Sequence, residues 1–281
     1  MRILVTGSNG MLGKDLCPTL EDTGYEVIKT DIHNLDVTDA VAVSKVLKES
    51  CPDTVIHCAA YTNVDKAEED YETAEKINAF GTENIAKTCA EIDIPIVYIS
   101  TDYVFDGTKS IPYTPDDIPN PVNNYGLTKL QGEKAVKKYC KKYYIVRTSW
   151  LYGHHGKNFI ETIISLLFEK PEIHVVNDQT GCPTWTVELA KGITKLFNKP
   201  YGTYHVCGSG YTTWYGFAKE IKSRLSEEES INCEILPCTT DEFPRPARRP
   251  KYSVMENQTL CADWKIALRN YMSERKVKLQ L

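Results

Sequence analysis

A tyrosine and a lysine four positions apart, Tyr125 and Lys129, could carry acid–base chemistry. At the start of a helix this spacing places both side chains on one face, about 6 Å apart. A phenol has a pKa of about 10 in small peptides, but an adjacent ammonium stabilises the phenolate and lowers that pKa toward neutrality. Thr101 follows an apolar run, and its hydroxyl could orient a carbonyl group toward the phenol. The three residues therefore predict proton transfer at a carbonyl oxygen.

A glycine-rich turn near the N-terminus, T-G-x-x-G-x-x-G, follows the apolar residues 2–5 and precedes a helical pattern over 11–20. In a dinucleotide-binding fold, Gly7 would permit the tight turn and Gly10 would let the backbone approach a pyrophosphate. Gly13 would let the helix pack close to the sheet, and the helix N-terminus would attract the anion. The spacing differs from G-x-G-x-x-G, and a simple strand-to-helix turn is the alternative interpretation.

A second predicted strand, residues 25–30, ends at Asp31. A carboxylate there would accept a hydrogen bond from the adenosine ribose 2′-hydroxyl and repel a 2′-phosphate. A loop or capping aspartate is the alternative. Because Lys14 or Lys29 could partly neutralise a phosphate, the sequence leaves the choice between NADH and NADPH open.

The elements that must position these residues alternate between strand and helix patterns. Strands are predicted at 2–5, 25–30, 53–60 and 95–99, and helices at 11–20, 40–50, 71–92 and from Tyr125 onward. This order predicts an α/β fold with a Rossmann-type doubly wound parallel sheet. Residues 1–150 would form the NAD(P)-binding domain. Residues 151–281 would form mainly a smaller C-terminal substrate-binding lobe, interleaved with the first domain, with helices at 157–169, 187–197 and 214–225, a strand at 173–176, and a solvated helix end at 227–229.

Composition argues against several classes of protein. A net charge of −5 gives no electrostatic case for binding nucleic acid or an anionic membrane. The chain has no apolar run of about 18 residues and no signal-peptide pattern, so we expect a cytoplasmic protein without a membrane partner. The ten cysteines include no C-x-x-C pair. They predict reduced thiols rather than disulfides, and no metal site.

Further strings in the chain point to a known family. The glycine motif, S-T-D-Y-V-F at 100–105, Y-x-x-x-K and R-T-S-W-L-Y-G at 147–153 resemble the extended short-chain dehydrogenases/reductases. Within that superfamily the chain resembles the dTDP-4-dehydrorhamnose reductases, because residues 59–68, 177–184, 212–215 and 245–250 match strings of that family. The resemblance implies an NADH- or NADPH-dependent enzyme that reduces the 4-keto group of dTDP-4-dehydro-6-deoxy-L-mannose to give dTDP-L-rhamnose.

The resemblance also implies roles for individual residues. Tyr125 would protonate the keto oxygen, Lys129 would lower the pKa of Tyr125 and hold the nicotinamide ribose, and Thr101 would hydrogen-bond the carbonyl. The implied cofactor contacts are Gly7, Gly10, Met11, Leu12, Gly13, Asp31, Asp36, Val37, Ala59, Ala60, Tyr61, Tyr125 and Lys129. The implied substrate contacts are Val64, Thr101, Asp102, Tyr103 and Trp150.

Arginines at 245, 248 and 249 stand among prolines and could clamp the diphosphate of a dTDP-sugar, since guanidinium groups suit phosphate oxygens. We place Arg248 among the substrate contacts, with a solvated basic loop as the alternative.

Two other functions fit the same motifs. A non-catalytic NADP-binding regulatory subunit, like that of methionine adenosyltransferase, would also bind a dinucleotide, and a reductase or epimerase of another sugar nucleotide would differ only in its sugar pocket. Some members of the family form homodimers around a magnesium ion held by glutamates. The sequence allows such a homodimer and magnesium at its interface, but it assigns no ligands.

Overall fold

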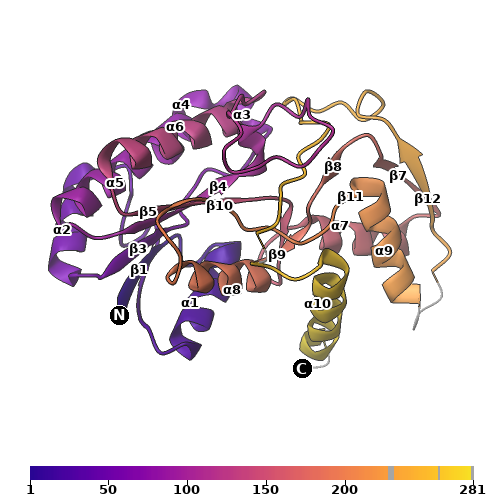
Figure 1. The fold of residues 1–281 in the computed structure, drawn as a ribbon. Coiled ribbons are helices and arrows are strands. Elements are labelled where there is room, and N and C mark those ends of the chain that lie inside the picture. Colours follow the sequence, from indigo (N-terminus) through magenta and orange to yellow (C-terminus); the bar gives the residue numbers. More distant parts are fainter. Residues whose placement is uncertain (227–230, 259, 280–281) are drawn as a thin grey trace.

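A parallel six-stranded sheet forms the centre of the computed structural model, which describes residues 1–226, 231–258 and 260–279 (Figure 1). The strand order is β10-β5-β4-β3-β1-β2. The strands are β1 (Arg2–Thr6), β2 (Glu26–Thr30), β3 (Thr54–His57), β4 (Ile96–Thr101), β5 (Tyr143–Thr148) and β10 (Gly202–His205). The predicted Rossmann-type parallel sheet is therefore confirmed.

Helices cover both faces of the sheet (Figure 1). One face carries α1 (Met11–Asp22) and α8 (Thr186–Leu196), and the other carries α2 (Ala40–Ser50), α5 (Thr82–Glu91) and α6 (Asn124–Tyr139). The strands are apolar on both sides for this reason. In β1, Ile3 and Val5 join the core under α1 and α8, whereas Leu4 joins the core under α2 and α5.

The helical run predicted at 71–92 is interrupted by a wider turn. It begins as α4 (Tyr71–Glu75), continues as the π-helical segment η1 (Lys76–Gly81) and ends as α5. Such π-helical turns inside helices often lie at functional sites. Two shorter helical segments, α3 (Lys66–Glu69) and the 3₁₀ turn η2 (Asp102–Val104), follow the carboxyl ends of β3 and β4.

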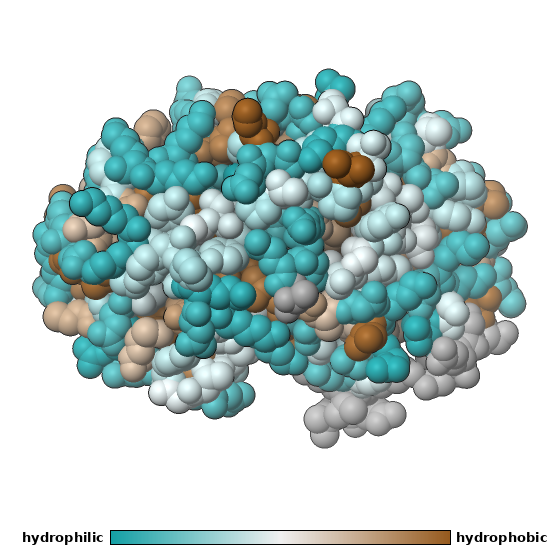
Figure 2. All heavy atoms as spheres, viewed as in Figure 1, coloured by the Kyte–Doolittle hydropathy of each residue, from teal (hydrophilic) through white to brown (hydrophobic). Residues whose placement is uncertain are grey.

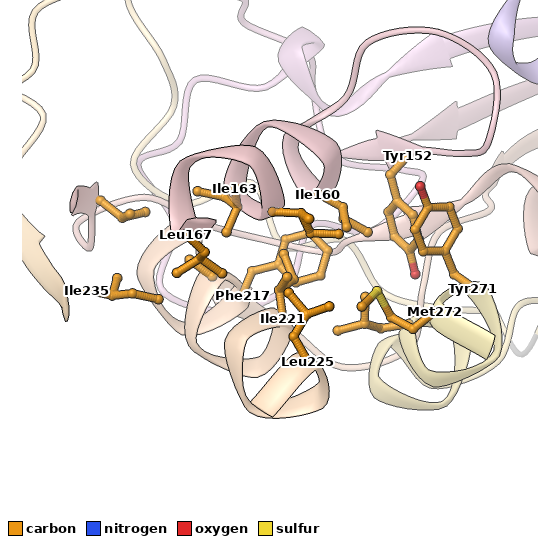
Figure 3. Close-up of a cluster of buried hydrophobic side chains, with 14 of the residues drawn as sticks. Tyr152, Ile160, Ile163, Leu167, Phe217, Ile221, Leu225, Ile235, Tyr271 and Met272 are labelled. Atoms are coloured by element: carbon orange, nitrogen blue, oxygen red, sulfur yellow. The ribbon is translucent and has the colours of Figure 1, made fainter. Parts of the chain in front are cut away.

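The second half builds a lobe beside the sheet around its own apolar core (Figure 3). This core includes Ile163 from α7 (Phe159–Glu169), Phe217 from α9 (Trp214–Ser226) and Tyr271 from α10 (Trp264–Leu279). The strands β7 (Glu172–Val176) and β12 (Glu234–Cys238) pair in parallel at one side. The remaining strands form two-residue pairs, β6 (Leu151–Tyr152) with β9 (Thr184–Trp185) and β8 (Thr180–Gly181) with β11 (Thr212–Thr213). The predicted helix end at 227–229 lies outside the described residues.

The chain returns from this lobe to the sheet. Helix α8 packs against α1, and β10 pairs with β5 to form an edge of the sheet. The face shown in Figure 2 carries mainly hydrophilic side chains, with hydrophobic residues in isolated spots. Among the helices of the described residues, none is both long enough and apolar enough to cross a bilayer.

Candidate active site

A cavity of about 680 Å³ lies where the chain reverses its direction across the sheet. From β1 the chain moves outward to β2 and then returns to β3 on the other side of β1, so ligands are expected at the carboxyl ends of β1 and β3. We call this the switch-point cavity. The predicted residues that line it are Gly7, Gly10, Met11, Leu12, Gly13, Asp31, Asp36, Val37, Ala59, Ala60, Val64, Thr101, Asp102, Tyr103, Tyr125, Lys129 and Trp150.

The glycine turn forms one end of this cavity and leaves no room for larger side chains. Gly7 has a φ of +65°, and a Cβ there would lie 2.8 Å from the backbone nitrogen of Ala59. A Cβ at Gly13 would lie 2.6 Å from Cα of Ser8. Gly10 donates a backbone hydrogen bond to the Gly7 carbonyl at 3.0 Å and caps α1. The backbone itself is therefore the wall that a ligand would approach.

The carboxylate of Asp31 is fixed at the end of β2. It accepts hydrogen bonds from the backbone N–H groups of Asn9 at 3.0 Å and Ile32 at 2.8 Å. Lys29, one of two candidates for neutralising a phosphate here, instead pairs with Glu21 at 2.7 Å. The charge of Lys29 is therefore already paired with a carboxylate.

Thr101 and Tyr125 meet in the same cavity, at the end of β4 and the start of α6. The Thr101 hydroxyl donates to the Asp102 carboxylate at 3.0 Å and accepts from the Tyr103 backbone N–H at 3.2 Å. Burial raises the pKa of Tyr125 to about 12, although a hydrogen bond with Thr101 opposes this rise. Burial therefore outweighs the lowering predicted from the neighbouring ammonium. The Tyr125 phenol stays protonated across neutral pH, as a proton donor must.

Lys129 is buried beside Tyr125, with its ammonium 4.2 Å from the ring centroid of Tyr98. Burial lowers the pKa of Lys129 to about 7, while the carboxylate of Glu133 raises it. Lys129 therefore titrates near neutral pH, unlike an exposed lysine.

A second and larger cavity, of about 1230 Å³, adjoins the first at Tyr103 and Trp214. We call it the arginine cavity, because Arg245, Arg248 and Arg249 line it. The guanidinium of Arg245 lies over the ring of Phe243, 4.7 Å from its centroid. The predicted substrate contact Arg248 is thus in the arginine cavity and not in the switch-point cavity.

Trp150 lines the switch-point cavity and is held there in a strained conformation. Its φ of +47° is unusual for a bulky residue, and such strain tends to occur at ligand sites. Its indole lies parallel to that of Trp214, with ring centroids 3.5 Å apart and planes 4° apart. On Gly181, a Cβ would lie 2.5 Å from Nε1 of Trp150, so only glycine leaves room for the indole.

Comparisons of the sequence and of the structure with known proteins point to the same family. The family model described as RmlD substrate binding domain matches residues 1–280. A solved dTDP-4-dehydrorhamnose reductase from Clostridium acetobutylicum is 47% identical, with a TM-score of 0.94 over 98% of this chain and 100% of that one. The chain belongs to the dTDP-4-dehydrorhamnose reductase family. The resemblance seen in the sequence motifs is thereby confirmed.

Two further relatives are similar over nearly their whole length. The spore coat polysaccharide biosynthesis protein SpsK of Bacillus subtilis is 40% identical over 98% of each chain. The dTDP-4-dehydrorhamnose reductase of Bacillus anthracis, solved in complex with NADP, is 42% identical, with a TM-score of 0.93 over 97% of this chain and 99% of that one.

The switch-point cavity has features that suit a dinucleotide such as the NADP in the structure of the Bacillus anthracis relative. A glycine turn without side chains and a carboxylate after β2 are features that suit a pyrophosphate and an adenosine ribose. Asp102 faces the same space, and burial raises its pKa to about 6.

Tyr61 does not line either cavity, although it was predicted as a cofactor contact. Its backbone is instead held by Asn78 of η1, whose amide accepts from the Tyr61 N–H at 2.8 Å and donates to the Tyr61 carbonyl at 3.1 Å. The Asn78 amide also donates to Thr128 Oγ1 at 3.1 Å, between Tyr125 and Lys129 on α6. Asn78 therefore connects the end of β3 with the helix of the candidate catalytic residues.

Asn78 and Trp214 were not predicted as site residues from the sequence. A lone asparagine in a helical run carries little signal. Trp214 lies in the string at 212–215 that resembles the family, but that string alone assigns it no contact. Trp214 donates from Nε1 to the Gln179 amide at 3.2 Å, and Phe159 packs on its ring at 4.5 Å. Trp214 is thus a fixed part of the boundary between the cavities.

Proposed function

We propose that this chain reduces the 4-keto group of dTDP-4-dehydro-6-deoxy-L-mannose to give dTDP-L-rhamnose, with NADH or NADPH as the hydride source. The observation that carries the proposal is the junction of the two cavities beside Thr101 and Tyr125. A dinucleotide would fill the switch-point cavity, and a sugar nucleotide would extend from the junction into the arginine cavity. The NADP complex of the Bacillus anthracis relative supports the first assignment.

Tyr125 is the proposed general acid. A bound nicotinamide would supply hydride to the keto carbon. Tyr125 would donate its phenol proton to the keto oxygen, and Thr101 would hold that oxygen by a hydrogen bond. Because the pKa of Tyr125 is about 12, the phenol retains its proton at neutral pH. The charged form of Lys129 would stabilise the phenolate that remains and hold the nicotinamide ribose.

The sugar nucleotide would be held from both sides of the junction. Val64, Asp102, Tyr103 and Trp150 would contact the hexose, because all four line the switch-point cavity next to Tyr125. Arg248 would bind the diphosphate from the arginine cavity. A homodimer, with magnesium at its interface, remains a prediction that light scattering with and without a chelator would test.

The test measures NADH and NADPH oxidation by loss of nicotinamide absorbance, with enzymatically prepared dTDP-4-dehydro-6-deoxy-L-mannose as substrate. Turnover that Tyr125→Phe abolishes would support the proposal. Tight cofactor binding without turnover would instead favour the regulatory-subunit alternative. Turnover with a different keto sugar nucleotide, but not with this one, would favour the alternative of another sugar-nucleotide enzyme.

A further inference from the structure

Glu133 is a buried carboxylate that does not line either cavity, yet it lies close to the candidate active site. It follows Lys129 by four residues on α6, and both side chains are about 98–99% buried, with relative exposures of 1% and 2%. Residues at this spacing lie on one face of a helix, about 6 Å apart. Glu133 is therefore placed directly behind the lysine of the candidate site.

Hydrogen bonds fix the Glu133 carboxylate in position. Arg147 on β5 donates from Nε to Oε1 at 2.9 Å and from Nη2 to Oε2 at 2.8 Å. Ser100 on β4 donates to Oε1 at 2.6 Å. Arg147 also donates to the Pro115 carbonyl at 3.2 Å. A buried carboxylate held by an arginine from two sides and by a serine hydroxyl does not rotate freely.

The neighbouring titratable groups His57, Cys58, Tyr98 and Tyr125 carry no negative charge that could stabilise the Lys129 ammonium. Burial lowers the pKa of His57 on β3 to about 3, so its ring is neutral. Burial raises the pKa of the Cys58 thiol after β3, of the Tyr98 phenol on β4 and of the Tyr125 phenol on α6, so these groups also stay neutral. Asp102 lies on the Tyr125 side of the site, and its own pKa is raised by burial. The Glu133 carboxylate makes the largest contribution that opposes the fall in the pKa of Lys129, ahead of Cys58.

We propose that Glu133 is a positioning residue that keeps the Lys129 ammonium charged in a buried site, with Arg147 and Ser100 holding the carboxylate in place. The consequence for catalysis rests on the proposed function of Lys129. A charged Lys129 can stabilise the Tyr125 phenolate and bind a ribose hydroxyl, whereas a neutral amine does neither as well. The Glu133–Arg147 pair would then serve the reaction without touching any reactant.

The test is the pH dependence of Glu133→Gln, which keeps the size of the side chain and removes its charge. Without the carboxylate, the already lowered pKa of Lys129 falls further, so the ammonium is lost at a lower pH. A screened charge at this distance is expected to shift a pKa by about one unit. The alkaline limb of kcat/KM should therefore move about one pH unit lower, and activity should return toward that of the unchanged protein at acidic pH. An equal loss at every pH, with the limb in place, would overturn the proposal.

Two variants separate this effect from a loss of stability. Glu161→Gln breaks a partly buried pair with Arg275 in the other lobe, 2.8 Å between Nε and Oε1, and should leave the alkaline limb unmoved. If Glu133→Gln fails to fold, the double variant Glu133→Gln/Arg147→Met removes both buried charges and should fold, since apolar replacement of a buried pair is often tolerated. The double variant should show a shift of the limb in the same direction but a smaller one, because the positive charge of Arg147 is lost together with the carboxylate. A limb that moves to higher pH would contradict the proposal.

Cofactor affinity gives a readout that does not depend on the sugar. NADH binding can be followed by NADH fluorescence over the same pH range. The dissociation constant of NADH should increase as Lys129 loses its proton, and in Glu133→Gln this increase should occur about one pH unit lower than in the unchanged protein. A shift in binding without any sugar turnover would support the role of Glu133 while the proposed reaction fails. Turnover with no shift in either profile would contradict the role of Glu133 alone.

Discussion

The guanidinium of Arg249 forms a two-pronged ion pair with the carboxylate of Asp65, at 2.6 Å between Nη1 and Oδ1 and 2.9 Å between Nη2 and Oδ2. The two residues are 184 positions apart in the chain. Asp65 follows β3 of the sheet, and Arg249 belongs to the loop that lines the arginine cavity. This pair therefore attaches the candidate diphosphate loop to the strand end that borders the switch-point cavity.

Replacing Asp65 with Asn should weaken this attachment. The pKa of Asp65 is lowered chiefly by the hydrogen bond from Arg249, so the folded state gains stability above the ordinary pKa of 3.8 and loses it as pH falls. Asp65→Asn should lower the free energy of unfolding by about 1–2 kcal/mol at neutral pH. In urea titrations, the difference in the free energy of unfolding between Asp65→Asn and the unchanged protein should become smaller below about pH 4. An equal difference at both pH values would show that the ion pair is not its source.

Replacing Tyr125 with Phe should abolish proton donation and leave the cavity intact. The expected loss in kcat is about 10² or more, as for removal of a general acid. NADH binding, followed by fluorescence, should stay within about twofold, because the ring and its packing against Tyr103 at 5.7 Å are retained. A variant that keeps most of its turnover would remove Tyr125 from the role of proton donor.

Asp31 should set a preference for NADH. Its carboxylate is fixed by two backbone N–H groups, and the nearby Lys29 is paired with Glu21. Asp31→Ser should raise the ratio of kcat/KM for NADPH over NADH by about tenfold or more, since a repelled phosphate costs on the order of 1.4 kcal/mol. Asp22→Asn removes the same charge at the far end of α1 and should leave the ratio unchanged. Equal ratios in both variants would exclude Asp31 as the determinant.

Trp214 should control sugar-nucleotide binding through Trp150. Its removal exposes one face of the Trp150 indole and frees a residue held at a φ of +47°. Trp214→Ala should raise KM for the sugar nucleotide by about tenfold, consistent with the loss of a stacked aromatic pair. Trp214→Phe should restore much of the affinity. Cofactor affinity should not change, and a parallel loss of NADH binding would indicate a general disturbance of the fold.

Local patterns in the sequence predicted most of the first half. The glycine turn, the apolar strands and the Tyr125–Lys129 spacing depend on neighbours along the chain. The structure places the glycine turn, Tyr125 and Lys129 around one cavity. Where the chain crosses between the sheet and the lobe, local patterns carried little information. The stacking of Trp214 on Trp150 joins segments far apart in sequence, and no periodicity reports such a contact.

The pKa values of Tyr125 and Lys129 could not be predicted from their spacing, because they depend on burial. The Tyr125–Lys129 spacing suggested a lowered phenol pKa, but desolvation of both side chains raises the pKa of Tyr125 and lowers that of Lys129. Tyr61 is predicted as a cofactor contact, but it is not among the residues that line the switch-point cavity, whereas its neighbours Ala60 and Thr62 are. Both differences arise from three-dimensional surroundings that a linear motif does not encode.

Because α8 and β10 return to the sheet from late in the chain, the core of the sheet cannot be completed until most of the chain has been synthesised. Ile3 and Val5 of β1 and Leu16 of α1 emerge first, but Leu189 and Ile193 of α8, which complete their core, are synthesised much later. Until then one side of the nascent sheet stays exposed to solvent and to other chains. Incomplete sheets of this kind are prone to aggregation, so synthesis of this protein should depend on chaperones that shield the apolar face of α1.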